Sequence, residues 1–472
     1  GDRGAHELIR LTLADIAEIT GGRLRGADPD TPVTGPVEFD SRRVAPGGLF
    51  LAFPGEHADG HDFVGQAIAS GAVAAIVTRP VDAPSIEVGD GFTALAALAS
   101  AVVRRLTGVT VVAVTGSSGK TSTKDLLAQL LERLGPTIAP PESFNNELGH
   151  PYTVLLSTVD TRFLVLETSA RGIGHIRYLT DIAPPRIGVV LNVGSAHVGV
   201  FGSQDAIAQA KGELVEALPA DGGVAVLNAD DPLVAAMASR TAARIVTFGE
   251  SAGADVRATD VRLDDLGRGV FRLHAGSESA PVALRVIGRH QVGNALAAAA
   301  VALECGMPLD AAAEALSDAT ARSSRRMEPR ERNGVLILND AYNANPESMR
   351  AALETLAWIG RDRLARTWAV LGPMAELGDT AAPEHETVGR LAAQLAVGRL
   401  VAVGEQARSI VRGATGLDAV WVPDTDAAIS LLRAQVRPGD VVLVKASRSA
   451  SLERVAVALG DEMAPDVAQA RP

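Results

Sequence analysis

Cysteine, aromatic residues and long apolar runs are all scarce in this chain of 472 residues. Its one cysteine, Cys305, excludes an intramolecular disulfide framework and favours a reducing compartment. Because Cys305 follows an alanine-rich apolar run, we expect it to act as a small buried hydrophobe rather than as a nucleophile. Aromatic residues make up 3%, which leaves few rings for stacking nucleic-acid bases. No apolar run reaches the roughly 18 residues of a membrane-spanning helix, so we expect no membrane insertion.

Positive charge is also in short supply. The formal net charge is −12, which argues against nucleic acid as a partner because nucleic-acid binders carry a basic field. The N-terminal residues contain no apolar stretch of the kind found in secretion signals, so we expect a cytoplasmic protein. Apolar residues nevertheless make up 47%, and a chain of this length divides into several domains, each with its own core.

Lysine is the rarest basic residue, with four lysines among the 44 lysines and arginines. Lysine is a compact charge that can lose its proton, whereas arginine is a permanently charged planar fork. In a chain so rich in arginine, the few lysines therefore indicate positions where arginine could not perform the same role. They are Lys120, Lys124, Lys211 and Lys445.

The pattern of strands and helices predicts an α/β protein of three domains. We expect a small α/β domain over residues 1–86, a central domain with a mostly parallel sheet over 87–321, and a Rossmann-like domain over 322–472. The central domain has strand-like runs at 109–114, 163–166, 187–191, 224–227 and 244–248, a β-rich section at 256–287, and helices at 92–106, 122–134 and 292–304. A first helix is predicted at 13–20, with Thr12 as its N-cap. The third domain has strands at 335–339, 367–371, 400–403 and 440–444 and helices at 347–359, 384–395 and 425–435.

A glycine-containing loop joins the strand at 109–114 to the helix at 122–134. It contains Gly116, Ser117, Ser118, Gly119, Lys120, Thr121 and Ser122. Glycines let backbone N–H groups close around phosphate oxygens at the start of a helix. Lys120 would reach the β- and γ-phosphates of ATP, and the Thr121 hydroxyl would ligate Mg²⁺. The usual pattern has a glycine five residues before Gly119, where this chain has Val114.

Three further candidate residues come after predicted strands of the central domain in the sequence. Glu167 comes directly after the strand at 163–166 and could hold Mg²⁺ opposite Thr121, since the carboxyl ends of parallel strands meet at one edge of the sheet. His197 follows the strand at 187–191 and is either a third group at this edge or a turn histidine. Lys211 next to metal ions would be repelled as an ammonium, so we expect it to be carbamylated by CO₂ to an anion, the alternative being a surface helix lysine.

Polar residues also mark the entry to the third domain. His290 and Asn294 open the alanine-rich helix at 292–304, where Asn294 either reads the nucleotide base or belongs to the first turn. Arg326 could stabilise a transferring phosphate, and Asp340 could hold a ribose hydroxyl.

Taken together and in this order, these motifs resemble the Mur ligase family, whose members join amino acids to a UDP-muramoyl peptide with ATP. The family's phosphate loop also lacks the distant first glycine. The resemblance implies that Lys120 and Thr121 contact ATP and Mg²⁺, that two metal ions are bound, and that Lys120, Glu167, His197 and Lys211 are catalytic. It makes Glu167, His197 and carbamylated Lys211 metal ligands with Thr121, and places Asn294, Arg326 and Asp340 at the nucleotide.

Further stretches resemble the family members that act late in the pathway. Phe-Asp-Ser-Arg at 39–42 is the stretch that resembles these late members in general. More specifically, Ser-Phe-Asn-Asn at 143–146, Asp-Ala-Tyr-Asn-Ala-Asn-Pro at 340–346 and Lys-Ala-Ser-Arg at 445–448 are similar to the ligase that adds D-Ala-D-Ala. The substrate-binding residues implied are Ser41, Arg42, Asn145, Asn146, Asn343, Lys445, Ser447 and Arg448. The chain departs from the family at His150, where an apolar residue is usual, and at Gly199, where many members have Glu.

The resemblance implies an enzyme that phosphorylates the terminal carboxylate of UDP-N-acetylmuramoyl-tripeptide and then joins it to D-Ala-D-Ala. We expect these small molecules as its partners and a monomer as its state. Rival functions are a folylpolyglutamate synthetase, the tripeptide-forming Mur enzyme, a phosphate-loop kinase or regulatory ATPase, and a nucleotide-binding structural protein. The third residue of the tripeptide, diaminopimelate or lysine, stays open.

Overall fold

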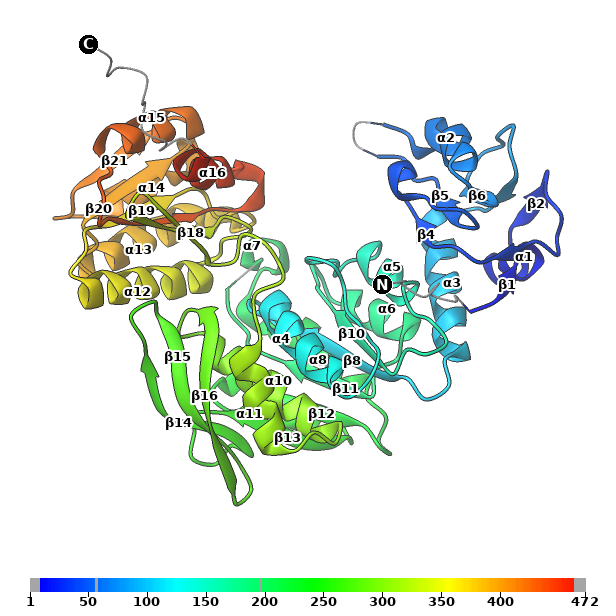
Figure 1. The fold of residues 1–472 in the computed structure, drawn as a ribbon, viewed down its shortest axis with the longest axis horizontal. Helices are drawn as coiled ribbons and strands as arrows, with labels where there is room; N and C mark the ends of the chain where they lie inside the picture. Colours follow the sequence, from blue (N-terminus) through cyan, green and yellow to red (C-terminus); the bar gives the residue numbers. More distant parts are fainter. Residues whose placement is uncertain (1–8, 56–57, 196, 462–472) are drawn as a thin grey trace, which may run out of the picture.

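The computed structural model describes residues 9–55, 58–195 and 197–461, arranged as three lobes in chain order (Figure 1). The N-terminal stretch considered above for a secretion signal lies largely outside the described residues. Within the described ranges, no helix is long and apolar enough to cross a membrane. The predicted α/β class with three domains is confirmed.

The N-terminal lobe is built on a five-stranded sheet with the order β2-β7-β6-β5-β4. Its strands are β2 (Arg23–Arg25), β4 (Val37–Glu38), β5 (Leu49–Leu51), β6 (Ala74–Val77) and β7 (Ser85–Glu87), with β1 (Leu11–Thr12) and β3 (Pro32–Val33) forming a separate pair and α2 (Val64–Ala69) lying on the sheet. The predicted first helix is confirmed as α1 (Leu13–Thr20), and the Thr12 hydroxyl accepts a hydrogen bond from the Asp15 backbone as its N-cap.

Helix α3 (Gly91–Arg105) joins this lobe to the central one (Figure 1). One core cluster contains Leu13 of α1, Leu95 and Leu98 of α3, and Leu164 and Leu179 of the central domain. Burying apolar surface from both sides of a single helix fixes the two lobes to each other. The domain boundary predicted at residue 86 lies inside β7, the strand that precedes the helix serving both domains.

The central domain carries a nine-stranded sheet with the order β16-β15-β14-β13-β12-β11-β8-β10-β9. The strands are β8 (Thr110–Thr115), β9 (Thr137–Ile138), β10 (Phe163–Glu167), β11 (Ile187–Val190), β12 (Val224–Asn228), β13 (Arg244–Gly249), β14 (Val256–Leu263), β15 (Arg268–Ala275) and β16 (Glu278–Ile287). Pairing is parallel from β9 to β14 and antiparallel beyond. The central parallel strands β8, β10, β11 and β12 are buried on both faces, which is why they read as continuous apolar runs.

Helices cover both faces of this sheet. They are α4 (Lys120–Glu132), α5 (Gly149–Val154), α6 (His175–Ile182), α7 (Val198–Phe201), α8 (Gln204–Glu216), α9 (Pro232–Ala235), α10 (Gln291–Glu304) and α11 (Leu309–Asp318). The helices α4, α10 and α11 share one core, whereas α8 packs into a second core against the opposite face. The predicted helix at 122–134 begins two residues earlier, inside the phosphate loop.

The C-terminal domain has a six-stranded sheet with the order β17-β18-β22-β19-β20-β21. Its strands are β17 (Glu328–Arg332), β18 (Val335–Asp340), β19 (Thr367–Leu371), β20 (Arg399–Val403), β21 (Ala419–Val422) and β22 (Val441–Lys445), and its helices are α12 (Pro346–Arg363), α13 (Ala381–Gln394), α14 (Arg408–Gly413), α15 (Thr425–Gln435) and α16 (Glu453–Asp461). Only β17 pairs antiparallel. Two separate cores lie on the two faces of the sheet.

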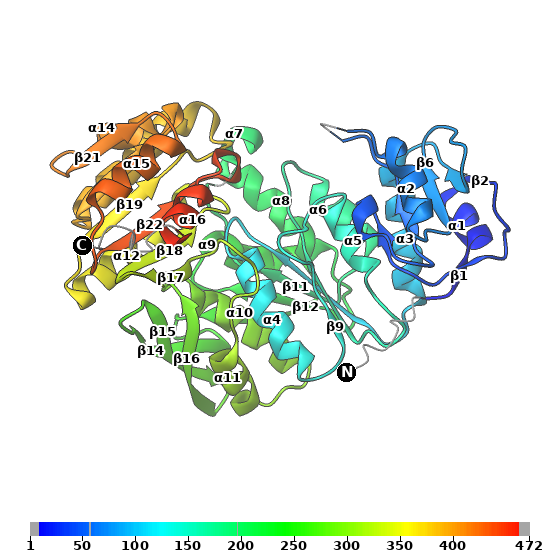
Figure 2. The same ribbon diagram turned by 45° about the horizontal axis from the view of Figure 1, so that its top comes forward.

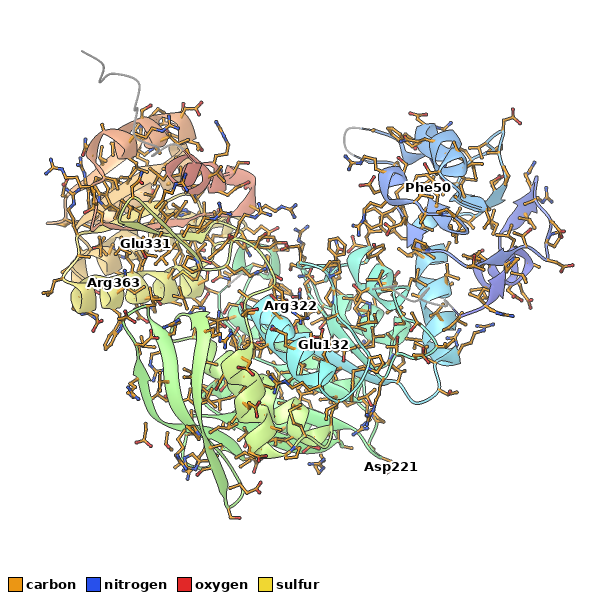
Figure 3. All side chains as sticks on the ribbon, viewed as in Figure 1. Phe50, Glu132, Asp221, Arg322, Glu331 and Arg363 are labelled. Carbon is orange, nitrogen blue, oxygen red and sulfur yellow. The ribbon has the colours of Figure 1, made fainter. Side chains whose placement is uncertain are left out.

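The segment that leaves the central domain runs back along α4 before it enters β17. Arg322 forms a double ion pair with Glu132 at the end of α4, at distances of 2.6 and 2.7 Å (Figure 3). Ser323 donates its backbone N–H to Asp125, and Lys124 donates to the Ser323 hydroxyl at 3.3 Å. Lys124 is buried and pairs with Asp125 at 2.6 Å. This lysine therefore anchors the interdomain segment and does not face the phosphate loop's ligand side.

Candidate active site

A cavity of about 590 Å³ lies between the central and C-terminal domains. It brings together most of the residues predicted from sequence, although they come from positions more than 300 apart in the chain. The predicted residues that line it are Ser117, Ser118, Gly119, Lys120, Thr121, Ser122, Asn145, His197, Asn294, Arg326, Asp340, Asn343, Lys445 and Arg448. Those absent from its lining are Ser41, Arg42, Gly116, Asn146, Glu167, Lys211 and Ser447.

The phosphate loop is held in shape by its own side chains and by the neighbouring strand end. The Asn192 amide clamps Ser118 on both sides, accepting from the Ser118 N–H and donating to the Ser118 carbonyl, each at 3.0 Å. Lys120 donates to the Gly116 carbonyl at 2.7 Å. Gly119 has φ +85°, and a Cβ there would lie 2.5 Å from the Asn294 amide oxygen. The loop thus needs glycine at this position both for its backbone conformation and for the close approach of α10.

Basic side chains gather around this loop. Burial lowers the pKa of Lys120, opposed by Glu167 and assisted by Arg326. Arg326 donates to the Thr121 hydroxyl at 2.9 Å, and its guanidinium lies 4.4 Å from the centre of the Tyr342 ring. Positive charge from two domains therefore converges where the loop would receive a polyphosphate.

Glu167 is the last residue of β10 and is fully buried. One of its oxygens, Oε2, accepts hydrogen bonds from the Ser143 hydroxyl at 3.2 Å and from the Asn145 amide at 3.3 Å. The other, Oε1, is buried and has no hydrogen-bond partner among the described residues. A buried carboxylate oxygen without a donor is costly, and a cation is the group that would satisfy it.

Lys211 lies on α8 and is 2% exposed, so it is not a surface lysine. Among the described residues, the charge that acts on its ammonium is the like charge of Lys120. Burial, together with the nearby Lys120 charge, lowers the pKa of Lys211 well below its ordinary value. Desolvation and the Lys120 charge therefore both disfavour the ammonium form of Lys211 in the folded protein.

His197 precedes α7 and has a left-handed backbone, with φ +66°. Its Nδ1 forms an ion pair with Glu376 of the C-terminal domain. Burial is the main cause of the lowered pKa of His197, while Glu376 raises it. Across the described residues, no group of three or more His, Cys, Asp or Glu side chains is placed to hold a metal ion. A cation here would need ligands from a substrate as well, as Mg²⁺ in nucleotide sites commonly has.

Asp340 and Lys445 pair with each other at the far wall of the cavity. The Lys445 ammonium donates to Asp340 Oδ2 and to the Asn343 carbonyl, each at 2.8 Å. Asp340 Oδ1 accepts the backbone N–H of Met327 at 3.1 Å. The pair fixes the strand ends β18 and β22 to the segment that carries Arg326.

The remaining predicted substrate residues have structural contacts of their own. Ser41 is buried in the N-terminal lobe near Gln66, and Arg42 is exposed beside Asp40 at 2.8 Å. Asn146 accepts the backbone N–H groups of Leu148 and Gly149 at the start of α5. The Ser447 hydroxyl accepts from the Ala375 backbone at 2.8 Å. At the cavity rim, the Arg448 guanidinium lies 5.7 Å from the Tyr342 ring centre.

Glu347, Asn345 and Tyr342 are among the cavity residues that were not predicted from sequence. Glu347, in the first turn of α12, accepts from the Ser195 backbone at 2.7 Å and from its hydroxyl at 2.9 Å. Asn345, the N-cap of α12, donates to the Ser117 carbonyl at 3.4 Å. The Asn345-Pro346 pair signals a helix start, but no sequence pattern indicates that this helix points at Ser117 and Ser195, nor that Tyr342 lies under Arg326.

Comparisons with known proteins agree with this arrangement. Family models match residues 36–105 (Mur ligase family, catalytic domain), 114–302 (Mur ligase middle domain) and 325–448 (Mur ligase, glutamate ligase domain). The UDP-N-acetylmuramoyl-tripeptide–D-alanyl-D-alanine ligase of Mycobacterium tuberculosis is 52% identical, covering 96% of this chain and 98% of that protein. The Escherichia coli ligase of the same name is 36% identical, covering 96% and 99%.

Solved structures give the same result. MurF of Acinetobacter baumannii is 34% identical, with a TM-score of 0.87, covering 96% of this chain and all of that one. MurF of Thermotoga maritima, in complex with ADP, is 31% identical, with a TM-score of 0.79, covering 91% and 98%. Matched over most of its length in sequence and in fold, this chain belongs to the Mur ligase family.

Proposed function

We propose that this protein is an ATP-dependent ligase that joins D-Ala-D-Ala to the terminal carboxyl group of UDP-N-acetylmuramoyl-tripeptide, forming ADP and phosphate. Relatives carrying that name cover almost the whole chain. The observation that carries the proposal is the convergence on one cavity of the phosphate loop with Arg326, Asp340 and Lys445 of the C-terminal segment. An enzyme that must bring a nucleotide, a carboxylate and an amine together needs such a site between domains.

In the first step, a carboxylate oxygen of the tripeptide attacks the γ-phosphorus of ATP. The bond to the β–γ bridging oxygen breaks, ADP leaves, and an acyl phosphate forms. Both reactants are anionic and repel each other. Lys120, within the loop, and Arg326, from the C-terminal segment, would offset this repulsion. They would also stabilise the charge that develops on the transferring phosphoryl group.

The donor set fits Mg²⁺. The unpaired Oε1 of Glu167, the Thr121 hydroxyl and His197 would hold it together with phosphate oxygens, and two ions are expected. Bound there, the metal would supply charge neutralisation at the β- and γ-phosphates.

We also propose that Lys211 is carbamylated. Its buried amine, in the deprotonated form that burial favours, would attack the carbon of CO₂ and release one N–H proton, which leaves an anionic carbamate facing Lys120 and His197. This product supplies the negative charge that the ammonium lacks among its described neighbours. Incubation with ¹³C-bicarbonate should give one carbamate carbon signal that is absent from a Lys211→Ala variant. An identical spectrum for both proteins would refute the modification.

In the second step, the amine of D-Ala-D-Ala attacks the acyl carbon, the C–O bond to phosphate breaks, and the nitrogen loses its extra proton. We assign the dipeptide to the C-terminal side of the cavity, near Asn343, Lys445, Ser447 and Arg448. The exposed Arg448 guanidinium at the rim would bind its carboxylate. Ser41 and Arg42 of the N-terminal lobe would contact the UDP portion. We also propose a cytoplasmic enzyme that works as a monomer.

The test is phosphate release from ATP with UDP-N-acetylmuramoyl-tripeptide and a panel of amines. We expect release and a new amide product with D-Ala-D-Ala. Product with another amine but none with D-Ala-D-Ala would overturn the substrate assignment. Release that needs no amine would indicate an ATPase instead.

A further inference from the structure

Glu376 connects two loops of the central domain from the C-terminal side. It lies after β19, before the short turn of Gly378–Thr380. One carboxylate oxygen contacts Arg171 at 3.2 Å, and the other forms the ion pair with His197 Nδ1, a buried nitrogen that has no aligned hydrogen-bond partner among the described residues. Figure 2 shows α7, which begins directly after His197, lying against the C-terminal domain. A single carboxylate thus holds the loops that follow β10 and β11.

Both partners of the His197–Glu376 pair have a left-handed backbone although neither is glycine. Their φ angles are +66° and +62°. Such conformations are unfavourable and persist where surrounding contacts enforce them, often at switch regions and ligand sites. Because His197 and Glu376 both have this backbone conformation and face each other between two domains, we infer that contacts within each domain hold the pair in place.

The backbones next to this pair touch without side chains between them. A Cβ at Gly199 would lie 2.4 Å from the Gly378 N atom. In this chain, the missing side chain lets α7 and the Gly378 turn approach closely, which brings Glu376 within reach of His197.

We propose that Glu376 is a positioning residue for cation binding: when the C-terminal domain docks, its carboxylate accepts the Nδ1–H of His197 and leaves Nε2 as the nitrogen that faces the metal. Metal-ligating histidines commonly donate their second ring N–H to a carboxylate, which fixes the tautomer and the ring orientation. Here that carboxylate comes from a different domain. Docking of the domain and cation affinity are therefore coupled, and each strengthens the other. The inference rests on the proposed function only in taking His197 as a metal ligand.

The experiment measures Mn²⁺ binding by electron paramagnetic resonance, with a non-hydrolysable ATP analogue and the full chain. Outer-shell carboxylates of this kind contribute roughly 10- to 100-fold to metal affinity, so Glu376→Ala should weaken Mn²⁺ binding by about that factor. Glu376→Gln should recover most of the loss, since its amide oxygen still accepts the Nδ1–H. The matched control is Glu405→Ala, which removes an exposed carboxylate paired with Arg408 in the same domain and should leave the affinity unchanged. Wild-type affinity in Glu376→Ala would overturn the proposal.

A second variant keeps both partners and blocks their approach. Gly199→Ala places a methyl group against the Gly378 backbone, so it should weaken Mn²⁺ binding as Glu376→Ala does, and small-angle scattering should show a less compact protein with the analogue bound. Unchanged affinity and compactness in Gly199→Ala would refute the coupling. The outcome is separable from the amine panel: loss of Mn²⁺ affinity in these variants supports the inference whichever amine the wild-type protein uses.

Discussion

Replacing Lys445 by methionine should destabilise the C-terminal domain through charge alone. Methionine keeps the length and apolar stem of lysine and removes the ammonium. In the structure, the Lys445 side chain is 3% exposed and that of Asp340 15% exposed. Among the described residues, the substitution would leave Asp340 with the Met327 N–H as its one donor, and the Asn343 carbonyl would lose its side-chain donor.

The expected magnitude follows from this burial. Removing one partner of a buried ion pair costs about 3–5 kcal/mol, and the slight exposure of Asp340 places the effect near 3 kcal/mol. For a domain of this size, each kcal/mol lowers the unfolding midpoint by roughly 2–4 °C, so the midpoint should fall by about 6–12 °C. Lys445→Met combined with Asp340→Asn should recover part of this loss, because the uncompensated charge is gone.

The assay uses a property of the sequence. All three tryptophans, Trp358, Trp368 and Trp421, lie in the C-terminal domain, so tryptophan fluorescence during urea unfolding reports on that domain and not on the other two. The control is Arg390→Ala, which breaks an exposed pair with Glu386 at 3.9 Å and should cost at most about 1 kcal/mol. A Lys445→Met protein within about 1 kcal/mol of wild type, or no recovery in the double variant, would refute the reasoning.

Three further predictions concern other parts of the molecule. Burial lowers the pKa of His150 from 6.5 to about 3, so below pH 6.5 the unfolded chain takes up a proton that the folded chain does not. Stability should therefore fall as the pH drops, by about 2 kcal/mol at pH 5, and His150→Val should remove this dependence in calorimetry at pH 8 and pH 5. Tyr152→Phe removes the 2.9 Å hydrogen bond to buried Glu38 and should cost about 1–3 kcal/mol in the same calorimetric experiment. Gly119→Ala should weaken ATP binding at least about tenfold in titration calorimetry, because its φ is +85° and its Cβ would meet Asn294.

Each of these has a control and an outcome that contradicts it. An equal loss of stability at pH 5 in wild type and His150→Val would mean that other groups cause it. Tyr178→Phe alters an exposed tyrosine and should change stability little; an equal effect of both tyrosine substitutions would count against the Glu38 contact. Gly65→Ala adds a methyl group where no atom lies within 4 Å, and ATP binding as weak in that variant as in Gly119→Ala would exclude the local clash.

Much of the fold was predictable because its strands are buried on both faces. Runs such as the one that became β8 (Thr110–Thr115) contain little but apolar and β-branched residues, and each is followed by a glycine or a polar residue at the sheet edge. The phosphate loop was predictable for the same local reason, since its chemistry lies within seven consecutive residues. Short, mixed elements such as α5 and β21 gave no such signal and were missed.

The parts of the site that involve two domains were not predictable. Glu376 and Glu347 look like ordinary charged residues in the sequence, and their roles depend on how one domain docks on another. Lys124 shows the converse. Its position one turn after the phosphate loop was compatible with an ammonium that faces the bound phosphates. In the structure, the ammonium instead contacts Asp125 and Ser323. The direction in which a helical side chain points decides which groups it contacts, and tertiary contacts set that direction.

The core shared through α3 has a consequence for how the protein is made. Its residues run from Leu11 to Ala183, with Leu164, Leu179 and Ile182 among the last. During synthesis from the N-terminus, the first lobe leaves the ribosome with α3 still lacking its partners on one side, and this core cannot close until residue 183 has emerged. The first two lobes should therefore mature together as one nascent unit, while the C-terminal domain folds afterwards, with one core of its own and a second that Ile287 of the central domain completes.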